Sequence, residues 1–314
     1  MRVGIDIMGG DFAPESPILG SLLARKELPP EVEIVFVGNK DIIEKYANEH
    51  QLDISQFPIV HTPDQVQMSD HPLKIFAKSP NAGIFLGQKM LKAGELDGFC
   101  SAGNTGAMLI GAMQIVSSIP GVIRPAISAA IPSLEGPNAQ ILDVGLNPDA
   151  RPDVQYQYAV IGSLYSKLIN NIENPRVSLL NIGKEEEKGN LVAKSTFHLM
   201  KDSIDFNFIG NVEANELFLN LETDVVVCDG FVGNIVLKEA EAFYRLVSKK
   251  QIGNGHFEMF NFENYGGSPV LGIQAPLVIG HGISNDKAIK NMILGTSNVV
   301  KAGLINKIKE ALNK

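Results

Sequence analysis

The stretch Asp224–Lys238, DVVVCDGFVGNIVLK, decides how this chain folds. Its apolar run 225–228 is β-branched and too short for a helix, which predicts a strand buried on both faces. The segment 229–234 interrupts the run, and a helix-like pattern starts at Ile235. A strand, a glycine-rich turn and a helix start aim backbone N–H groups at one point, which favours an anion there. The alternative is a tight turn that needs glycine only for a positive φ angle.

Composition sets limits on the class of protein. The chain has 314 residues, 45% of them apolar and 20% charged, which indicates a soluble globular protein. This length fits one large α/β domain, 1–314, or two lobes around a cleft. The net charge of −8 argues against nucleic-acid binding. The start of the chain lacks the pattern of a signal peptide, and Cys100 and Cys228 are expected to be reduced core residues in a cytoplasmic protein, with no disulfide or metal site.

Strands and helices are expected to alternate along the chain. Strands are expected at 2–7, 33–37, 58–61, 97–100, 126–131, 139–144, 177–182, 206–209, 225–228, 270–273 and 277–279. Helices are expected at 16–26, 41–49, 82–93, 105–117, 153–169, 190–201 and from 284 to the end, with a loop at 62–80 that holds at most one short helix. This alternation predicts a mostly parallel sheet with helices on both faces.

Polar side chains recur directly after these strands. The pairs are Asp6/Asp11, Asn104/Thr105, Asp143/Asn147, Lys188/Asn190, Asn211/Glu213, Asp229/Asn234 and His281/Ser284. Each pair alone is explained by helix capping. Because the carboxyl ends of parallel strands share one edge of a sheet, seven such pairs predict a common crevice that binds a ligand.

The residue types in these turns narrow the chemistry. The sequence lacks the dinucleotide and P-loop glycine motifs, the metalloprotease HExxH and the hydrolase GxSxG. Neither cysteine lies in a positively charged setting that would mark a nucleophile. Of six histidines only His281, which lies between two glycines, has a distinctive position. Amides, backbone N–H groups and a few lysines suit a small anion and a developing oxyanion.

Nine motifs together carry a resemblance to a known family. They are MGGDFAP (8–14), SAGNTGA (101–107), RPA (124–126), DVGLN (143–147), NIGKEEEKGN (181–190), FIGNVE (208–213), DVVVCDGFVGNIVLK (224–238), NYGGSPVLG (264–272) and IGHGISN (279–285). In this order they closely resemble the PlsX-type phosphate acyltransferases over nearly the whole chain. The resemblance implies a three-layer α/β/α fold akin to phosphotransacetylases and isocitrate-dehydrogenase-like enzymes. It also implies a homodimer that transfers a long-chain acyl group from acyl carrier protein to inorganic phosphate, for phospholipid synthesis, without a metal or other cofactor.

The expected reaction suggests roles for residues of these motifs, as a hypothesis. Substrate binding falls to Gly9, Gly10, Asp11, Asn104, Thr105, Asn147, Asn190, Asn211, Gly230, Gly233 and Gly267. Lys188 would neutralise phosphate charge, and Asn234 would donate to the oxyanion. His281 would move a proton, unless its imidazole only fixes a turn. Asp229 would orient Lys188 or a histidine.

The resemblance to this family also implies binding partners. Acyl carrier protein is acidic, so its docking on this acidic chain needs local cations, for which Arg245, Lys249 and Lys250 are candidates; a solvated charge run is the alternative. A downstream membrane acyltransferase is a further implied partner. The segment between Val247 and Asn264 is shorter than in many relatives, which argues against the weak membrane association that a longer hairpin there would support.

The sequence also allows other interpretations. Phe257, Met259, Phe260 and Phe262 could form an apolar lip for an acyl chain or pack locally. Two alternative functions are a phosphotransacetylase that acts on acyl-CoA and a non-catalytic anion-binding protein of the same fold.

Overall fold

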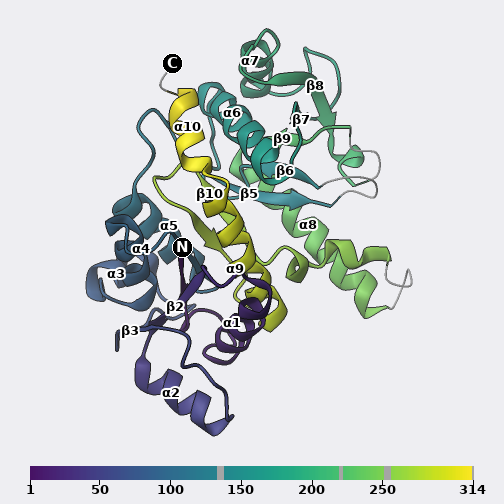
Figure 1. The fold of residues 1–314 in the computed structure, drawn as a ribbon. Helices are drawn as coiled ribbons and strands as arrows, with labels where there is room; N and C mark the ends of the chain where they lie inside the picture. The colour runs from purple at the N-terminus through teal and green to yellow at the C-terminus, as the bar shows by residue number, and fades with distance from the viewer. Residues whose placement is uncertain (133–137, 219–221, 251–255, 313–314) are drawn as a thin grey trace. The chain divides into compact units, whose positions relative to one another are not determined.

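The chain forms two compact units, shown in the ribbon of Figure 1. The structure is a computed structural model that describes residues 1–132, 138–218, 222–250 and 256–312. The first unit contains Met1–Ser117 and Phe262–Lys301, and the second contains Ser118–Asn261 and Ala302–Lys314. Each unit contains its own set of strands and helices.

The first unit is built on a sheet with the strand order β3-β2-β1-β4-β11-β10. The strands are β1 (Arg2–Asp6), β2 (Glu33–Gly38), β3 (Ile59–His61), β4 (Gly98–Ser101), β10 (Ser268–Leu271) and β11 (Leu277–Ile279). All neighbours pair in parallel except β10 and β11. The carboxyl ends of β1, β4 and β11 therefore lie at the same edge.

Helices cover both faces of this sheet. They are α1 (Glu15–Glu27), α2 (Lys40–Glu49), α3 (Pro72–Lys78), α4 (Gly83–Ala93), α5 (Thr105–Gly111), the π-helix η1 (Ala112–Val116), the 3₁₀-helix η4 (Phe262–Asn264) and α9 (Asp286–Lys301). Strand β2 shows why there are three layers, since its side chains alternate between faces. Ile34 and Phe36 join a core cluster with Ile289 of α9, whereas Val35 and Val37 join another cluster under α4.

The second unit has the strand order β5-β6-β9-β7-β8. Its strands are β5 (Ala126–Ile131), β6 (Ala139–Leu142), β7 (Arg176–Asn181), β8 (Asn207–Glu213) and β9 (Val225–Val227). Strands β6, β9, β7 and β8 are parallel, and β5 runs antiparallel to β6. The helices are α6 (Pro152–Ile169), α7 (Leu191–Met200), α8 (Gly230–Lys249), α10 (Leu304–Leu312) and the 3₁₀-helices η2 (Ala214–Glu216) and η3 (His256–Phe260). The predicted buried strand is confirmed, because β9 is central and all three of its valines are fully buried.

The structure confirms a mostly parallel α/β fold and corrects three helices. The helix expected from Ile235 begins five residues earlier, at Gly230. The helix expected at 105–117 changes to π-helical geometry after Gly111. The helix expected from 284 to the end is two helices, because Gly303 adopts a φ of +63° after Lys301 and turns the chain.

In the described residues, no helix combines the length and the apolar character that crossing a membrane requires.

Candidate active site

In the first unit, three turns meet at the carboxyl edge of the sheet. The turn after β1 contains Gly9, Gly10 and Asp11, and the amide of Asp11 donates a 2.7 Å hydrogen bond to the carbonyl of Gly282 in the turn after β11. Gly10 has a φ of +103°, and a Cβ atom there would lie 3.2 Å from the Gly282 oxygen and 3.4 Å from the Cβ of Ala102, in the turn after β4. These three turns therefore contact one another within this unit.

Asn104 and Thr105 begin helix α5. The Asn104 side chain accepts a 2.9 Å hydrogen bond from the Ala107 amide, as a helix cap does. Its nitrogen donates to the carbonyls of Gln67, Met68 and Asp70 at 3.0–3.3 Å. Both ends of this amide are thus engaged within the protein, and it ties the loop before α3 to α5. Thr105, by contrast, is exposed.

His281 lies in the turn after β11, next to the start of α9. Its ring packs against Phe262 with centroids 4.8 Å apart. Gly267 directly precedes β10, where Ser268 pairs with Ile279 two residues before His281.

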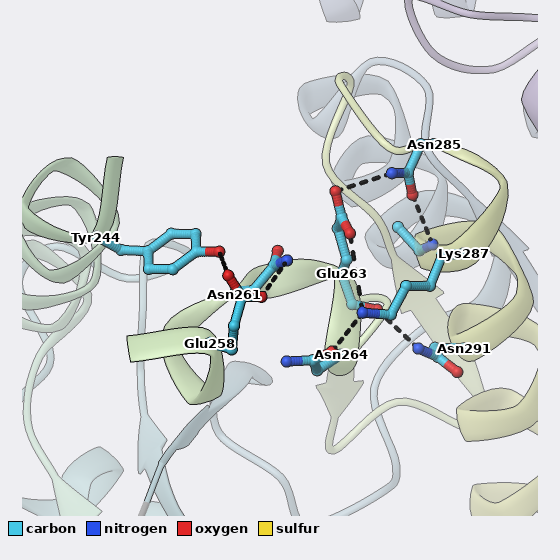
Figure 2. A network of polar contacts seen from close by, with 9 residues as sticks. Tyr244, Glu258, Asn261, Glu263, Asn264, Asn285, Lys287 and Asn291 are labelled. Atoms are coloured by element: carbon cyan, nitrogen blue, oxygen red, sulfur yellow. Dashed lines mark hydrogen bonds and ion pairs between the residues drawn. The ribbon is translucent and has the colours of Figure 1, made fainter. Parts of the chain in front are cut away.

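Polar contacts around η4 fix the chain beyond His281, as the right half of Figure 2 shows. Asn285 donates to the Glu263 carboxylate at 2.8 Å, Lys287 donates to Asn264 at 2.7 Å, and Asn291 donates to the Glu263 carbonyl at 2.7 Å. The start of α9 is therefore held by at least three hydrogen bonds to residues 263–264.

In the second unit, the turn after β6 packs against the first turn of α8. Asp143 is fully buried and accepts hydrogen bonds from the amides of Ile127 at 2.9 Å and Asn147 at 2.6 Å. Burial is the main cause that raises the pKa of the Asp143 carboxyl, although these hydrogen bonds oppose it. Asn147 donates through its side chain to the carbonyl of Pro125 at 2.6 Å, so its side chain serves the turn itself.

The motif after β9 is the start of a helix rather than a glycine turn. Asp229 caps α8 by accepting a 2.8 Å hydrogen bond from the Val232 amide. Gly230 and Gly233 lie inside the helix with ordinary φ angles, so the alternative of glycines needed for a positive φ is wrong. Gly233 is needed for close packing, since a Cβ there would lie 2.0 Å from the Asp143 carbonyl oxygen. Asn234 is exposed on the same helix turn.

A third group in the second unit follows β7. Lys188 is exposed and its ammonium lies 4.0 Å from Glu185, while its backbone carbonyl accepts from the Asn181 side chain at 3.2 Å. Asn190 caps α7 by accepting from the Ala193 amide at 2.8 Å. Because β7 and β9 are adjacent and parallel, the Lys188 loop and the start of α8 emerge at the same edge of this sheet.

Asn211 lies in β8, beside the Lys188 loop. Its side-chain nitrogen donates to the carbonyl of Glu185 at 2.9 Å, and its buried side-chain oxygen accepts no hydrogen bond from the residues that the structure describes. A cavity of about 340 Å³ opens beside it, lined also by Lys184 and Glu216, which form an ion pair at 2.5 Å.

The end of α8 carries the cations proposed for docking. Arg245 contacts Glu241 at 3.5 Å, whereas Lys249 and Lys250 are exposed. The left half of Figure 2 shows Tyr244 of α8 donating to Glu258 of η3 at 3.0 Å. This contact ties the helix to the segment that follows it, of which residues 251–255 lie outside the described part.

The aromatic residues considered as an acyl lip pack locally. The ring of Phe260 lies 5.4 Å from Phe218 and 6.4 Å from Phe257 in the second unit. Phe262 packs on His281 in the first unit.

The arrangement supports anion chemistry better than covalent catalysis by the protein. Burial raises the pKa of the Cys100 thiol to about 12 and also raises that of Cys228, so neither supplies a thiolate near neutral pH. Among the described residues, no group of three or more His, Cys, Asp or Glu side chains is placed to hold a metal ion. The groups left exposed at the two sheet edges include the Thr105 hydroxyl, the Lys188 ammonium and the Asn234 amide.

Two buried acidic residues emerge as part of these sites although the sequence did not single them out from the other turns. Asp6 and Asp143 end or follow their strands and organise the turn beyond. Their signal in the sequence is an acidic residue placed directly at the end of an apolar strand and followed by glycine within three residues.

Solved structures share the fold of this chain. EutD phosphotransacetylase from Staphylococcus aureus is 16% identical with a TM-score of 0.64, and the match covers 96% of this chain and 94% of that one. A branched-chain phosphotransacylase from Enterococcus faecalis is 14% identical with a TM-score of 0.61, and the match covers 96% and 99%. The chain therefore has the phosphotransacetylase-like α/β fold.

Sequence relatives define the family. The family model described as "Fatty acid synthesis protein" matches residues 1–254. The phosphate acyltransferase of Dictyoglomus thermophilum is 38% identical over all of this chain and 98% of its own length, and that of Bacillus cereus strain B4264 is 35% identical over 100% and 99%. The chain belongs to this family, which contains the phosphate acyltransferases, and it is an enzyme of the acyltransferase class.

Proposed function

We propose that this enzyme transfers a long-chain acyl group from acyl carrier protein to inorganic phosphate and releases acyl phosphate for phospholipid synthesis. One observation carries the proposal most. The chain matches phosphate acyltransferases over its full length, and within each unit polar side chains lie beyond the carboxyl ends of neighbouring parallel strands, at one edge of that unit's strands. Such an edge is suited to an anionic substrate.

The proposed reaction is a direct acyl transfer. A phosphate oxygen attacks the thioester carbonyl carbon, a C–O bond forms and the C–S bond breaks. The proton of hydrogen phosphate goes to the departing thiolate, so acyl phosphate and the free thiol of the carrier are the products. Binding both substrates in one complex makes the attack effectively unimolecular.

Each proposed catalytic residue has a distinct task in this reaction. Lys188 compensates the phosphate charge. Its side chain is exposed, and its ammonium lies 4.0 Å from the Glu185 carboxylate, at the limit of an ion pair. Asn234 donates to the oxyanion that forms on the carbonyl oxygen. His281 relays the proton of hydrogen phosphate to the departing thiolate, and its stacking on Phe262 limits the orientations of its ring. Asp229, which caps α8, contributes by fixing the helix turn that carries Asn234.

The proposed binding residues contribute mainly through the backbone and through their turns. Asn104, Asn147 and Asn190 use their side chains within the protein, as cap or turn residues. Gly9, Gly10, Asp11, Thr105, Asn211, Gly230, Gly233 and Gly267 complete the proposed set. In this proposal the asparagines hold the turns so that neighbouring N–H groups meet the phosphate.

The enzyme is proposed to work as a cytoplasmic homodimer that receives its donor at a cationic surface. Lys249 and Lys250 are exposed beside Leu246, whose side chain is 56% exposed. This combination suits an acidic carrier protein that also offers apolar contacts. The acyl phosphate product is proposed to pass to a membrane acyltransferase that uses glycerol 3-phosphate.

A comparison of two thioester donors tests the proposal. Palmitoyl-carrier protein and palmitoyl-CoA are each incubated with enzyme and phosphate, and the thiol released is followed with time. We expect phosphate-dependent release that is faster with the carrier-protein donor. Equal or faster release from the CoA thioester would favour a phosphotransacetylase, and no release from either donor would favour a non-catalytic anion-binding protein.

A further inference from the structure

A chain of buried hydrogen bonds links two turns of the first unit. Asp6, the last residue of β1, is 4% exposed and accepts from the Ser101 hydroxyl at 2.8 Å and from the Met8 amide at 3.1 Å. Ser101, the last residue of β4, is fully buried, and its oxygen accepts from the Gly103 amide at 2.9 Å. The carboxylate thus reaches the backbone of the turn after β4 through one hydroxyl group.

The two turns also pack directly on this pair. A Cβ atom on Gly9 would lie 2.6 Å from the Ser101 oxygen and 2.7 Å from the Asp6 carboxylate. A Cβ atom on Gly103 would lie 3.3 Å from the Gly9 Cα. The positions of the Gly9 and Gly103 backbones therefore depend on the positions of the Asp6 carboxylate and the Ser101 hydroxyl.

A buried carboxylate is a costly way to hold a fold together. Within the described part of the chain, Asp6 has hydrogen bonds but no ion pair. Its burial raises the pKa to about 6, and the hydrogen bonds from Ser101 and Met8 only partly oppose this. The neighbouring Cys100 thiol is also buried and uncharged near neutral pH. Because an apolar residue would avoid this cost, the buried carboxylate points to a role in function.

We propose that Asp6 is a positioning residue for phosphate, acting through Ser101 to fix the glycine turns 8–10 and 101–104. The inference rests on the proposed function, which assigns phosphate to backbone groups of these turns. It deepens that function because it adds two buried residues, Asp6 and Ser101, to the groups that determine phosphate binding. Asp6 itself is buried under the turns and is not expected to touch the substrate.

Two substitutions test this role with a matched control. Asp6→Asn replaces one of the two accepting carboxylate oxygens with an NH₂ donor and removes the charge, Ser101→Ala removes the hydroxyl, and the double variant makes both changes. The control is the surface pair Asp53 and Ser55 of the same unit, in which the Ser55 hydroxyl donates to the Asp53 carboxylate at 2.6 Å. Asp53→Asn and Ser55→Ala remove the same chemical groups away from the turns.

Two measurements are made on the full-length enzyme. Isothermal titration with inorganic phosphate gives the dissociation constant without any need for turnover. Steady-state acyl transfer gives separate KM values for phosphate and for the thioester. Circular dichroism and thermal melting establish that each variant is folded, and Ser101→Ala, which removes a single hydroxyl, keeps the test available if Asp6→Asn does not fold.

We expect weaker phosphate binding by about fivefold or more in each single variant, because a hydrogen bond that orders the site is lost. The KM for the thioester should stay within about twofold of wild type. The double variant should be no worse than the weaker-binding single variant, since both groups act through one chain.

Unchanged phosphate binding in folded Ser101→Ala would overturn the inference, as would a wild-type enzyme that does not bind phosphate. If the losses of phosphate affinity in the two single variants multiply in the double variant, Asp6 and Ser101 act independently, and the proposed chain from Asp6 through Ser101 is wrong. A wild-type enzyme that binds phosphate but makes no acyl phosphate would contradict the proposed function, while the titration would still decide the role of Asp6.

Discussion

The backbone amide of Gly230 donates a 2.8 Å hydrogen bond to the carbonyl oxygen of Asn147. This contact joins the turn after β6 to the first turn of α8. A Cβ atom on Gly230 would lie 2.7 Å from the buried Asp143 carboxylate and 2.9 Å from the Asn147 nitrogen. The glycines of the motif DGFVGN therefore allow the helix to approach the β6 turn, and the exposed Asn234 is placed by that approach.

Gly233→Ala tests this packing. The added methyl group would lie 2.0 Å from the Asp143 carbonyl oxygen and 2.9 Å from the Cys228 sulfur, so the helix must move. We expect a loss of about 2–3 kcal/mol in the free energy of unfolding, measured by urea denaturation. The control is Gly295→Ala in α9, where a Cβ would meet nothing within 4 Å, and where alanine should stabilise by about 0.5–1 kcal/mol. Equal effects of the two substitutions would contradict the packing argument.

Lys188→Ala tests the proposed charge compensation. The Lys188 side chain is 47% exposed and its ammonium lies 4.0 Å from the Glu185 carboxylate, so its loss should change the free energy of unfolding by less than about 1 kcal/mol. The kcat/KM for phosphate should fall by about 100-fold, because a charge that meets the reacting group is removed. Steady-state kinetics with varied phosphate make the measurement, and Lys194→Ala on α7 is the control. If Lys188→Ala has the same KM and kcat/KM for phosphate as the wild type, Lys188 does not belong to the phosphate site.

The stability of the protein should depend on pH through Asp6. Its pKa is raised from 3.8 to about 6 in the folded protein, chiefly by burial. Between these values the folded protein retains a proton that the unfolded chain releases. The contribution of Asp6 to the free energy of unfolding is therefore highest below pH 4 and falls as the pH rises. Above pH 6 it has decreased by about 3 kcal/mol.

Asp6→Asn isolates this effect, because asparagine does not titrate. The free energy of unfolding of the wild type minus that of the variant should fall by up to about 3 kcal/mol between pH 4 and pH 7. Urea denaturation at several pH values makes the measurement. A difference that stays constant over this range, or that rises, would show that the carboxyl is not buried as described.

Charge reversal at the end of α8 tests the proposed docking surface. Lys249→Glu together with Lys250→Glu should raise the KM for acyl carrier protein by about fivefold to tenfold at low salt, and less at high salt, because screening weakens the attraction. The KM for phosphate should not change. Lys45→Glu, at a side chain that is 75% exposed in the first unit, is the control. A KM for the carrier protein equal to that of the control would exclude this surface.

The sequence predicted the alternation of strands and helices because apolar runs and glycine turns are local signals. It placed the start of α8 too late, since glycines usually mark a turn, whereas here Asp229 caps the helix and the glycines lie inside it. It ran the last helix through Gly303 because one glycine in an amphipathic pattern does not by itself show a turn.

The roles of polar side chains were the hardest to predict. An asparagine after a strand can cap a helix or bind a ligand, and the sequence is the same in both cases. The choice at Asn104 depends on carbonyls of the loop before α3, more than thirty residues earlier in the chain, which only the folded structure brings within 3.3 Å. The burial of Asp6 likewise depends on neighbouring strands that are distant in sequence.

The most direct test follows the phosphate itself. Enzyme, palmitoyl-carrier protein and ³²P-labelled phosphate are mixed, and the lipid-extractable label is identified as acyl phosphate because hydroxylamine releases it as inorganic phosphate and leaves unlabelled acyl hydroxamate. The account predicts labelled acyl phosphate in amounts equal to the carrier thiol released, with much less from Lys188→Ala. Thiol release without label in acyl phosphate would show that phosphate is not the acceptor and would contradict the account.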